Sequence, residues 1–448
     1  MWTALFAVVA LGALLAPSPA QDGALEGQLR AALDREAQGV EGLSVAIAIG
    51  DELLLCEGRG YADVATGRRA QGDTRWRAGA LYPPLAALAL LRLADGGRVD
   101  LETPVAELLP DLAREGTPIR VRHLLQHTSG LPSYVAWHEA RSRDTPAEPG
   151  AILAWLATQP LDAHPGHCFA WSNSNALATA RIVEELTSEP LAEHLQRTLL
   201  EALDLRQTDF EGEGVPSRAA IHACYEAGGQ VVQDGHALLP FGAEGLCTSA
   251  PDLVRLVRGL AARRVVDDAT WRALLVPARG DDGEEIPWSI GLGLASLDGH
   301  RGLVLGGGHA GHRAHVAYYP TLDLSIAVLG ADCQAPVADI ERRLARMVLN
   351  VPEPGIHDLP LSPEDVGVYV GDYYLGCTRL VVLAAEGSLW LGAPAEPDVR
   401  LMYQGRDRFV REDDPDVQLV FLVDSPGEPA PAFLLVARGA QSVARRMR

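Results

Sequence analysis

Three side chains in two short segments of the sequence are candidates for attack on a carbonyl carbon. Ser129 lies in the segment HTSGLP, and Cys168 and Ser172 lie in the segment PGHCFAWSNSN. A hydroxyl or thiol becomes a nucleophile only when a neighbouring base accepts its proton. The candidate bases for Ser172 are His167 and His309, so a serine–histidine mechanism at Ser172 is one hypothesis. For Ser129 and Cys168, packing is the stronger expectation.

A second group of candidate functional residues is a run of histidines. His309, His312 and His315 recur every three residues, and His300 is close. On a helix such spacing suits a metal ion. The glycine-rich sequence around them instead predicts a loop and a strand, in which His309 and His315 face one way and His312 the other. Because no carboxylate or cysteine nearby completes a ligand set, we expect no metal site and no cofactor.

These residues must be positioned by a core, and the stretch WRAGALYPPLAALALLRLADGGRVDL at residues 76–101 predicts its central element. Leucines with interleaved alanines make the segment apolar nearly all round, which is typical of a fully buried helix. Pro83 and Pro84 fit only at the first turn of this helix, where a missing N–H costs little. Gly96 and Gly97 then end it.

This stretch resembles the nucleophile helix of serine β-lactamase-related proteins, the group of class C β-lactamases, DD-peptidases and related esterases. In that family an aromatic residue, a short spacer and a glycine precede Ser-x-x-Lys. Four further segments resemble family motifs in the same order, and together the five span most of residues 22–350. They are RHLLQHTSGLP at 122–132, PGHCFAWSNSN at 165–175, GLCTSAPDL at 245–253 and GGGHAGHRAHVAYYP at 306–320.

The residues that perform the family's chemistry are replaced. Ala80 stands at the serine position, Pro83 at the lysine position and Trp171 at the tyrosine position. All 38 basic residues are arginines, so no lysine elsewhere in the chain substitutes. An indole N–H donates a hydrogen bond but cannot act as a base. We therefore expect no covalent turnover by the family mechanism. His123 and His127 occupy positions where the family also has histidine, and for them the resemblance implies structural roles.

The resemblance leaves a set of ligand-binding positions. Asn173 keeps its amide, and His309 and Gly311 keep the family's His-x-Gly form on an expected edge strand. The resemblance implies that the backbone N–H groups of Ala80 and His312 form the oxyanion hole, which does not depend on their side chains. Such a cleft is expected to hold a peptidoglycan peptide or another small carboxylate or amide. The alternative is a relict cleft that binds nothing.

Charge and the N-terminal sequence bear on partners and location. The net charge of −21 argues against nucleic acid or an anionic membrane surface as a partner. Residues 1–20 resemble a secretory signal, with an apolar run from Ala4 to Ala16 and small residues Ser18 and Ala20 for cleavage. No basic residue precedes the apolar run, so an uncleaved anchor is the alternative. We expect export to the periplasm or the extracellular space.

The chain contains six cysteines, which allow fifteen complete pairings that the sequence cannot distinguish. Cys224 and Cys247 are the first pair to test because they are near in the sequence. Buried free thiols are an equal alternative. None of the cysteines has the spacing of a zinc site.

Predicted elements run from strands to helices and back to strands. This order indicates an α/β (α+β) domain at 22–350, with a sheet made from both ends of the segment and a helical region, as in serine β-lactamases and DD-peptidases. The expected strands are 43–49, 53–57, 288–297, 302–305, 315–319 and 324–329, and the expected helices are 22–40, 121–126, 151–159, 176–186, 191–203, 250–262 and 340–349.

A different character begins near residue 351. Residues 351–361 are rich in proline and predict a linker. Residues 362–448 contain short alternating runs separated by turns, which favour a small antiparallel β-barrel. This segment, opening with YVGDY at 369–373, resembles the lipocalin-like domain attached to many exported members of the family. The expected strands are 379–383, 388–392, 399–403, 408–411, 418–423 and 432–438.

Three functional hypotheses follow. The first is a catalytically inactive serine-hydrolase homologue that binds or scaffolds in the cell envelope. The second is a hydrolase with a rebuilt mechanism that uses Ser172 or a histidine. The third places the function in the barrel, which would oligomerise or cap the cleft of a partner. The oligomeric state and the ligand are left open by the sequence.

Overall fold

The computed structural model describes residues 19–114, 116, 118–139, 148–210, 225–226, 230–231, 246–286, 288–309, 311–331, 335–385, 387–393, 397–425, 427–437 and 440–447. The proposed export signal falls outside these ranges except for Pro19 and Ala20, which begin helix α1 (Pro19–Glu36). The signal therefore stays a prediction. No helix in the described part of the chain is long and apolar enough to cross a membrane.

A seven-stranded sheet joins the two ends of the larger unit, as the sequence predicts. Strand β1 (Gly42–Ile49) pairs antiparallel with β12 (Leu324–Gly330), from Leu43 opposite Gly330 to Ile49 opposite Leu324. The strand order is β3-β2-β1-β12-β11-β10-β9. The remaining strands are β2 (Glu52–Asp63), β3 (Arg68–Arg69), β9 (Gly293–Leu297), β10 (His300–His309) and β11 (His312–Tyr319), and the turn η4 (Pro320–Leu322) joins β11 to β12.

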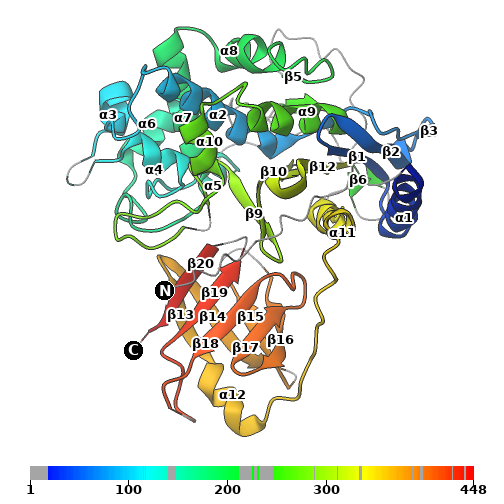
Figure 1. Cartoon of the computed structure of the whole chain (residues 1–448). Helices are drawn as coiled ribbons and strands as arrows, with labels where there is room; N and C mark the ends of the chain where they lie inside the picture. Colours follow the sequence, from blue (N-terminus) through cyan, green and yellow to red (C-terminus); the bar gives the residue numbers. More distant parts are fainter. Residues whose placement is uncertain are drawn as a thin grey trace, which may run out of the picture.

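Both faces of this sheet are covered, which explains why β1 and β12 are apolar at almost every position. Val45 and Ile47 of β1 pack in one core with α1 and α11 (Val337–Leu349), and Ala46 and Ala48 pack in another core with the helical region. Successive side chains of a strand point to opposite faces, so a continuous apolar run serves two cores. Figure 1 shows α11 between the sheet and the C-terminal barrel.

The helical region contains the predicted central helix, α2 (Tyr82–Asp95). Its side chains are buried over nearly its whole length, and Gly96 follows as its C-cap. The other elements of this region are α3 (Val105–Leu108), α4 (Val121–Leu125), α5 (Val135–Glu139), α6 (Pro149–Thr158), α7 (Asn173–Thr187), α8 (Leu191–Leu195), α9 (Ala250–Ala261) and α10 (Asp268–Leu274), the turns η1 (Gly79–Leu81), η2 (Pro110–Leu112) and η3 (Gln196–Leu200), and the short strands β4 (Trp76–Arg77), β5 (Asp209–Phe210), β6 (Tyr225–Glu226), β7 (Gln230–Val231) and β8 (Leu246–Thr248).

The C-terminal unit is a closed eight-stranded barrel. Aromatic side chains fill it, among them Phe409, Phe421 and Phe433, and α12 (Pro363–Tyr369) precedes the first strand. The sequence predicts six of the eight strands and misses β13 and β20. The strands are β13 (Gly371–Leu375), β14 (Thr378–Ala385), β15 (Ser388–Gly392), β16 (Val399–Gly405), β17 (Arg408–Arg411), β18 (Gln418–Leu422), β19 (Ala432–Ala437) and β20 (Ala440–Arg446).

Three further sequence predictions differ in detail from the structure. The strand expected over 288–297 begins only at Gly293, and β10 extends from 300 to 309 rather than 302–305. The helix expected over 191–203 is α8 followed by one π-helical turn, η3. Strand β20 does not show the alternation of apolar and polar residues by which strands are predicted. Its buried positions include the small residues Ser442 and Ala444, which contribute little hydrophobicity.

A disulfide bond between Cys168 and Cys377 ties the two units together. The sequence-based expectation that Cys168 is a packed or reactive thiol is therefore wrong. Cys377 lies in the β13–β14 turn, and its neighbour Gly376 is so close to Cys168 that a Cβ atom added at Gly376 would lie 2.8 Å from the Cβ atom of Cys168. The proposed Cys224–Cys247 pair involves Cys224, which lies outside the described residues, and stays a prediction.

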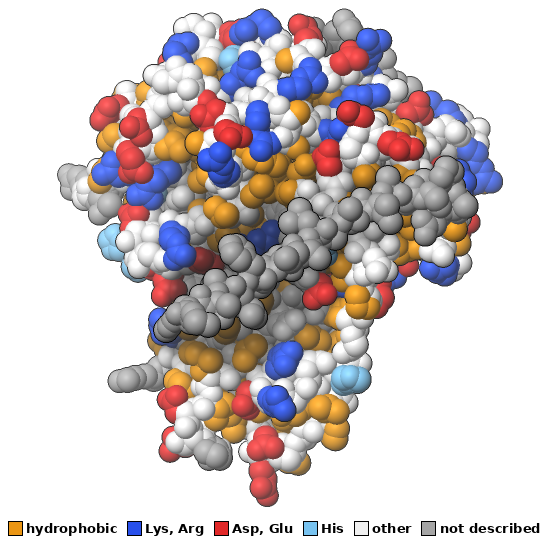
Figure 2. Space-filling model, in the orientation of Figure 1, with side chains coloured by type: hydrophobic (Ala, Val, Ile, Leu, Met, Phe, Trp, Pro, Cys, Tyr) orange, Lys and Arg blue, Asp and Glu red, His pale blue; other side chains and the backbone are white. Residues whose placement is uncertain are grey.

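Ion pairs join the barrel to α11 at a second place. Arg342 pairs with Asp414 and Arg346 pairs with Asp416, both in the connection between β17 and β18. Acidic and basic side chains are interspersed over the face of the molecule in Figure 2, rather than gathered by sign. The barrel is thus fixed to the sheet unit by a disulfide bond and by several ion pairs, which include Arg445 with Glu284 at 3.8 Å.

Replacing both bridging cysteines, Cys168→Ser with Cys377→Ser, should destabilise the protein. The bond closes a loop with a sequence separation of 209 residues, and removing such a cross-link enlarges the unfolded ensemble. We expect a loss of about 2–5 kcal/mol in the free energy of unfolding, measured by denaturant unfolding without reductant. Cys56→Ser, at a half-buried cysteine that the structure describes as unbridged, is the control and should cost less. Equal stability of the double variant and the wild type would contradict the prediction.

Candidate active site

The position of the family nucleophile lies in a short turn at the start of the central helix. Residue 80 is the middle residue of η1, between β4 and α2, and Gly79 before it has a positive φ of 40°. The N–H of Ala78 donates to the carbonyl of Leu246 at 2.7 Å, which holds this turn against β8. Turn η1 also contacts β10 and β11. The backbone of this turn is therefore held between β8, β10 and β11, and Ala80, at the position that the resemblance assigns to the nucleophile, offers no hydroxyl.

Two prolines and an indole enclose the space behind this turn. Pro83 and Pro84 are buried in the first turn of α2, where their missing N–H groups leave no broken helix bond. Together with His127, Trp171 and other residues they line a space of about 20 Å³. That volume holds about one water molecule. Where the family resemblance places a lysine amine and a tyrosine hydroxyl, this protein therefore has the ring of Pro83 and the indole of Trp171.

Trp171 covers this space from outside. Its ring stacks on His127 with the centroids 4.1 Å apart and meets Trp288 edge to face at 5.5 Å. His127 in turn meets Trp288 at 5.6 Å. Trp171 remains 42% exposed, so one face of the indole is in contact with solvent. His127, Trp171 and Trp288 therefore form an aromatic cluster at the solvent-exposed end of the site.

His127 fixes the loop that carries Trp171. Its Nδ1 accepts the backbone N–H of Ser172 at 3.3 Å and lies 3.2 Å from the side-chain amide of Asn175. Its own carbonyl accepts the N–H of Ala170 at 2.8 Å. Complete burial lowers the pKa of His127 to about 3. The ring is therefore neutral at pH 7, and because Nδ1 accepts, the proton is assigned to Nε2.

The two candidate serines are engaged in local structure. Ser172 is the N-cap of α7, and its buried Oγ accepts the N–H of Ser174 at 3.2 Å. Ser129 Oγ donates to Asn175 Oδ1 at 2.5 Å and accepts the N–H of Leu131 at 3.0 Å. An N-cap hydroxyl is held toward the helix backbone, which argues against Ser172 as a nucleophile. Asn173, the first residue of α7, is half-buried and follows Trp171 by two positions in the sequence.

The His-x-Gly segment forms the turn between β10 and β11. His309 and His312 are paired opposite each other, and Gly311 has a φ of +83°. Strand β9 is the outer strand, but it pairs with β10 only from His300 to Val304, so the end of β10 at His309 lies at a sheet edge, as the sequence predicts. His312 is 1% exposed, and its ring centroid lies 6.4 Å from that of Trp76. The side chain of His309 and the whole of Ala310 lie outside the described residues.

The remaining histidines do not converge. His315 Nε2 lies 3.4 Å from Glu341 on α11, and His300 Nδ1 lies 3.2 Å from the hydroxyl of Thr321. Among the residues that the structure describes, no three His, Cys, Asp or Glu side chains form a group that could hold a metal ion. The hairpin separates the side chains because its strands alternate their faces.

His123 has a structural role next to the site. Its Nδ1 accepts the N–H of Arg120 at 3.1 Å, and its Nε2 lies 3.8 Å from Asp281. Burial first, and then the charge of Arg122, lower the pKa of His123 to about 4. The N–H of Asp281 donates to the carbonyl of Gly166 at 2.8 Å, which links this histidine to the loop before Cys168.

Sequence reasoning missed two contributors to this site. Trp288 completes the aromatic cluster, but the apolar residues around it in the sequence predict only a strand. Cys168 fixes the end of the Trp171 loop, and only its partner in the distant barrel reveals that role. A site assembled from residues far apart in the chain gives no local signal of this kind.

A sheet made from both chain ends, helices on both faces and a turn that leads into a buried helix define the fold class of penicillin-binding proteins and serine β-lactamases. The Beta-lactamase family model matches residues 24–348, and the chain belongs to this family.

Three similar proteins illustrate the relationship. Esterase EstB of Burkholderia gladioli is 31% identical over 196 residues, which are 40% of this chain and 49% of the esterase, so the match spans about half the length of that relative. Penicillin-binding protein 4* of Bacillus subtilis is 22% identical over 438 residues, covering 90% of this chain and 94% of that protein. The structure of an octameric penicillin-binding protein homologue from Pyrococcus abyssi superimposes with a TM-score of 0.65 at 19% identity, over 94% of this chain and 99% of the other.

The two neutral buried histidines should make stability depend on pH. The unfolded chain protonates both below about pH 6.5, whereas the folded protein does so only near pH 4 at His123 and pH 3 at His127. Unfolding therefore takes up protons, and the free energy of unfolding should fall as the pH decreases from about 6.5, by about 1.4 kcal/mol per pH unit per histidine.

The variant His127→Asn isolates one of these contributions. Asparagine tolerates the positive φ of 53° at this position, offers an acceptor and does not titrate. Urea unfolding at pH values of about 6.5, 5.5 and 4.5 should give a slope lower by about 1.4 kcal/mol per pH unit than that of the wild type. The exposed control His357→Asn should keep the wild-type slope. An unchanged slope in His127→Asn would show that this ring charges in the folded protein.

Proposed function

We propose that this protein is an exported, catalytically silent member of the Beta-lactamase family that binds a small carboxylate or amide in the cell envelope. The observation that carries the proposal is that Pro83, His127 and Trp171 leave a space of only about 20 Å³ between them. This space lies behind the turn in which Ala80 stands at the nucleophile position. Each group needed for acyl transfer is replaced by one that packs.

The chemical argument begins with proton handling. Attack by a hydroxyl needs a base to accept its proton, and leaving-group departure needs an acid to return it. Pro83 carries no amine, and the indole of Trp171 has no basic nitrogen. His127 is neutral, but its Nδ1 already accepts the N–H of Ser172. Loss of one catalytic group lowers activity by orders of magnitude, and loss of all three leaves only the small acceleration that an oxyanion hole and binding supply.

The ligand class is argued from what remains. The backbone N–H groups at Ala80 and His312 are independent of side-chain identity and suit a carboxylate or carbonyl oxygen. The exposed face of Trp171 offers an apolar platform beside them, and Asn173 offers an amide. The name of penicillin-binding protein 4*, which matches nearly the whole chain, favours an amide of the penicillin kind, and the resemblance to DD-peptidases extends this to a peptidoglycan peptide.

A direct test is the intact mass of the purified protein after incubation with a β-lactam and with a panel of activated esters, together with hydrolysis rates. We expect no adduct and no turnover above buffer. A stable acyl adduct or clear turnover would overturn the proposal, and peptide mapping would then locate the nucleophile. Turnover that is abolished by Ser172→Ala would establish the rebuilt hydrolase instead.

Restoring the family's chemistry should distinguish an intact site from a collapsed one. The triple variant Ala80→Ser, Pro83→Lys and Trp171→Tyr replaces every lost group within a backbone that retains the turn before α2. We expect it to form a β-lactam adduct by mass spectrometry. The matched control Pro83→Lys with Trp171→Tyr lacks the hydroxyl and should form none. An inert triple variant that remains folded by circular dichroism would contradict the claim that the binding geometry survives.

A further inference from the structure

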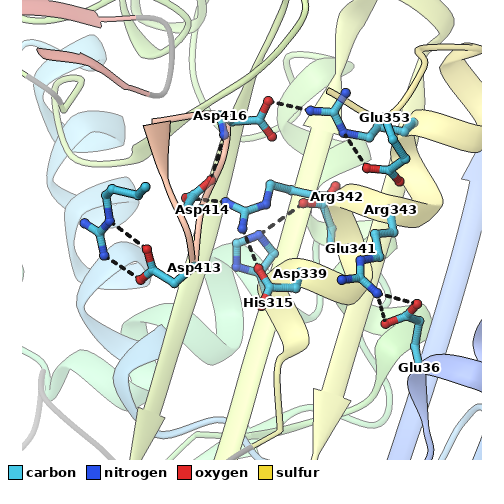
Figure 3. Close-up of polar contacts among 12 residues, drawn as sticks. Glu36, His315, Asp339, Glu341, Arg342, Arg343, Glu353, Asp413, Asp414 and Asp416 are labelled. Carbon is cyan, nitrogen blue, oxygen red and sulfur yellow. Dashed lines mark hydrogen bonds and ion pairs between the residues drawn. The ribbon is translucent and has the colours of Figure 1, made fainter. Parts of the chain in front are cut away.

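A cavity of about 310 Å³ lies where the sheet unit meets the barrel, on the face of the sheet opposite to α2. Its walls come from strands β9 to β11, from α11 and from the connection between β17 and β18. Figure 3 shows polar contacts in this region, and five of the labelled residues line the cavity: His315, Glu341, Arg342, Asp414 and Asp416. Trp288 lines both this cavity and the small space behind α2, but the cavity's other walls lie on the opposite face of the sheet from α2.

Glu341 of α11 is the most unusual group in the cavity wall. Its side chain is 1% exposed, and its Oε2 lies 3.4 Å from His315 Nε2. The hydroxyl of Tyr319 also interacts with this carboxylate, but the second oxygen, Oε1, is buried and has no hydrogen-bond partner among the residues that the structure describes. Leaving a buried carboxylate oxygen without a donor costs free energy unless a donor or cation arrives.

The arginines of α11 are committed to other acids. Arg342 pairs with Asp339 and Asp414, and Arg346 pairs with Asp416 and Glu353. A third arginine of the helix, Arg343, pairs with Glu36 of α1 (Figure 3). Asp414 and Asp416 also line the cavity, so the acids there already hold these cations in place. Each of these three arginines thus forms an ion pair with acids other than Glu341.

The rest of the cavity is shaped for more than one water molecule. Leu294, Val304 and Val337 give it apolar walls, and Trp288 closes one side. The run Gly306 to Gly308 in β10 contributes no side chains, and a Cβ atom at Gly306 would lie 3.0 Å from His315 Nδ1. A volume of about 310 Å³ is at the lower end of the range for small-molecule sites.

We propose that this cavity binds a small organic amine. The protonated amine donates to Glu341 Oε1, and the apolar body of the ligand packs against Leu294 and Val304. An ammonium group matches the missing donor and the negative charge at once. A bare metal ion would leave most of the apolar volume empty, and Glu341 has no second and third ligand positioned around it among the described residues.

The test uses the full-length wild-type protein and 4-fluorobenzylamine as the probe, followed by ¹⁹F NMR titration. The neutral isostere 4-fluorobenzyl alcohol is the matched ligand control. We expect the amine to bind at least about tenfold more tightly than the alcohol, because a charge-assisted hydrogen bond in a buried site discriminates by that amount. Equal affinities, or no binding of the amine, would overturn the proposal.

Two variants locate the site. Glu341→Gln keeps the shape and removes the charge, and it should weaken amine binding at least about tenfold, whereas Glu107→Gln at an exposed position on α3 should leave it unchanged. Ala338→Phe fills the cavity from α11 while retaining Glu341, and it should abolish binding even if the first variant folds poorly. Wild-type affinity in Ala338→Phe would place the amine elsewhere and refute the site. None of these measurements depends on whether the family cleft is catalytic.

Discussion

The antiparallel pairing of β1 with β12 is the contact on which the rest of the molecule depends. It brings the two ends of the larger unit together, so that α1 and α11 cover one face of the sheet and α2 lies against the other. The strands that continue from β12 place the β10–β11 hairpin beside the turn that carries Ala80. The candidate site therefore exists only because both ends share one sheet.

Within that frame, the positions that the resemblance assigns to the family's serine, lysine and tyrosine hold Ala80, Pro83 and Trp171, none of which can act as a nucleophile or a base. A lone serine-to-alanine change would leave a lysine buried beside an empty position, and an unpaired buried charge is costly. Here the lysine position is Pro83, which suits the first turn of α2, and the tyrosine position is Trp171, which stacks on a neutral histidine. The three replacements are mutually consistent in physical terms, since none leaves an unsatisfied polar group of the old mechanism.

The barrel is held against the sheet unit by a disulfide bond in one region and by ion pairs in another. The Cys168–Cys377 bond fixes it next to the loop that carries Trp171, and ion pairs from Arg342 and Arg346 fix it to α11. Between these regions lies the cavity that contains Glu341. The barrel, which the sequence presents as an appended domain, therefore lines the cavity at Glu341 and supports the loop that carries Trp171.

Sequence alone determined the class of fold, the sheet from both chain ends, the buried helix at Pro83 and Pro84, and six barrel strands, because periodicity and turn residues act locally. It also predicted that Ala80, Pro83 and Trp171 stand at the family's catalytic positions, since that prediction depends only on position within a motif. Tertiary structure decided the partner of Cys168, the closure of the barrel by β13 and β20, the neutral state of His127 and the isolation of Glu341. Each of these depends on groups that are distant in the chain, whose meeting no local pattern encodes, and on burial, which sets the energy of a charge only once the neighbours are in place.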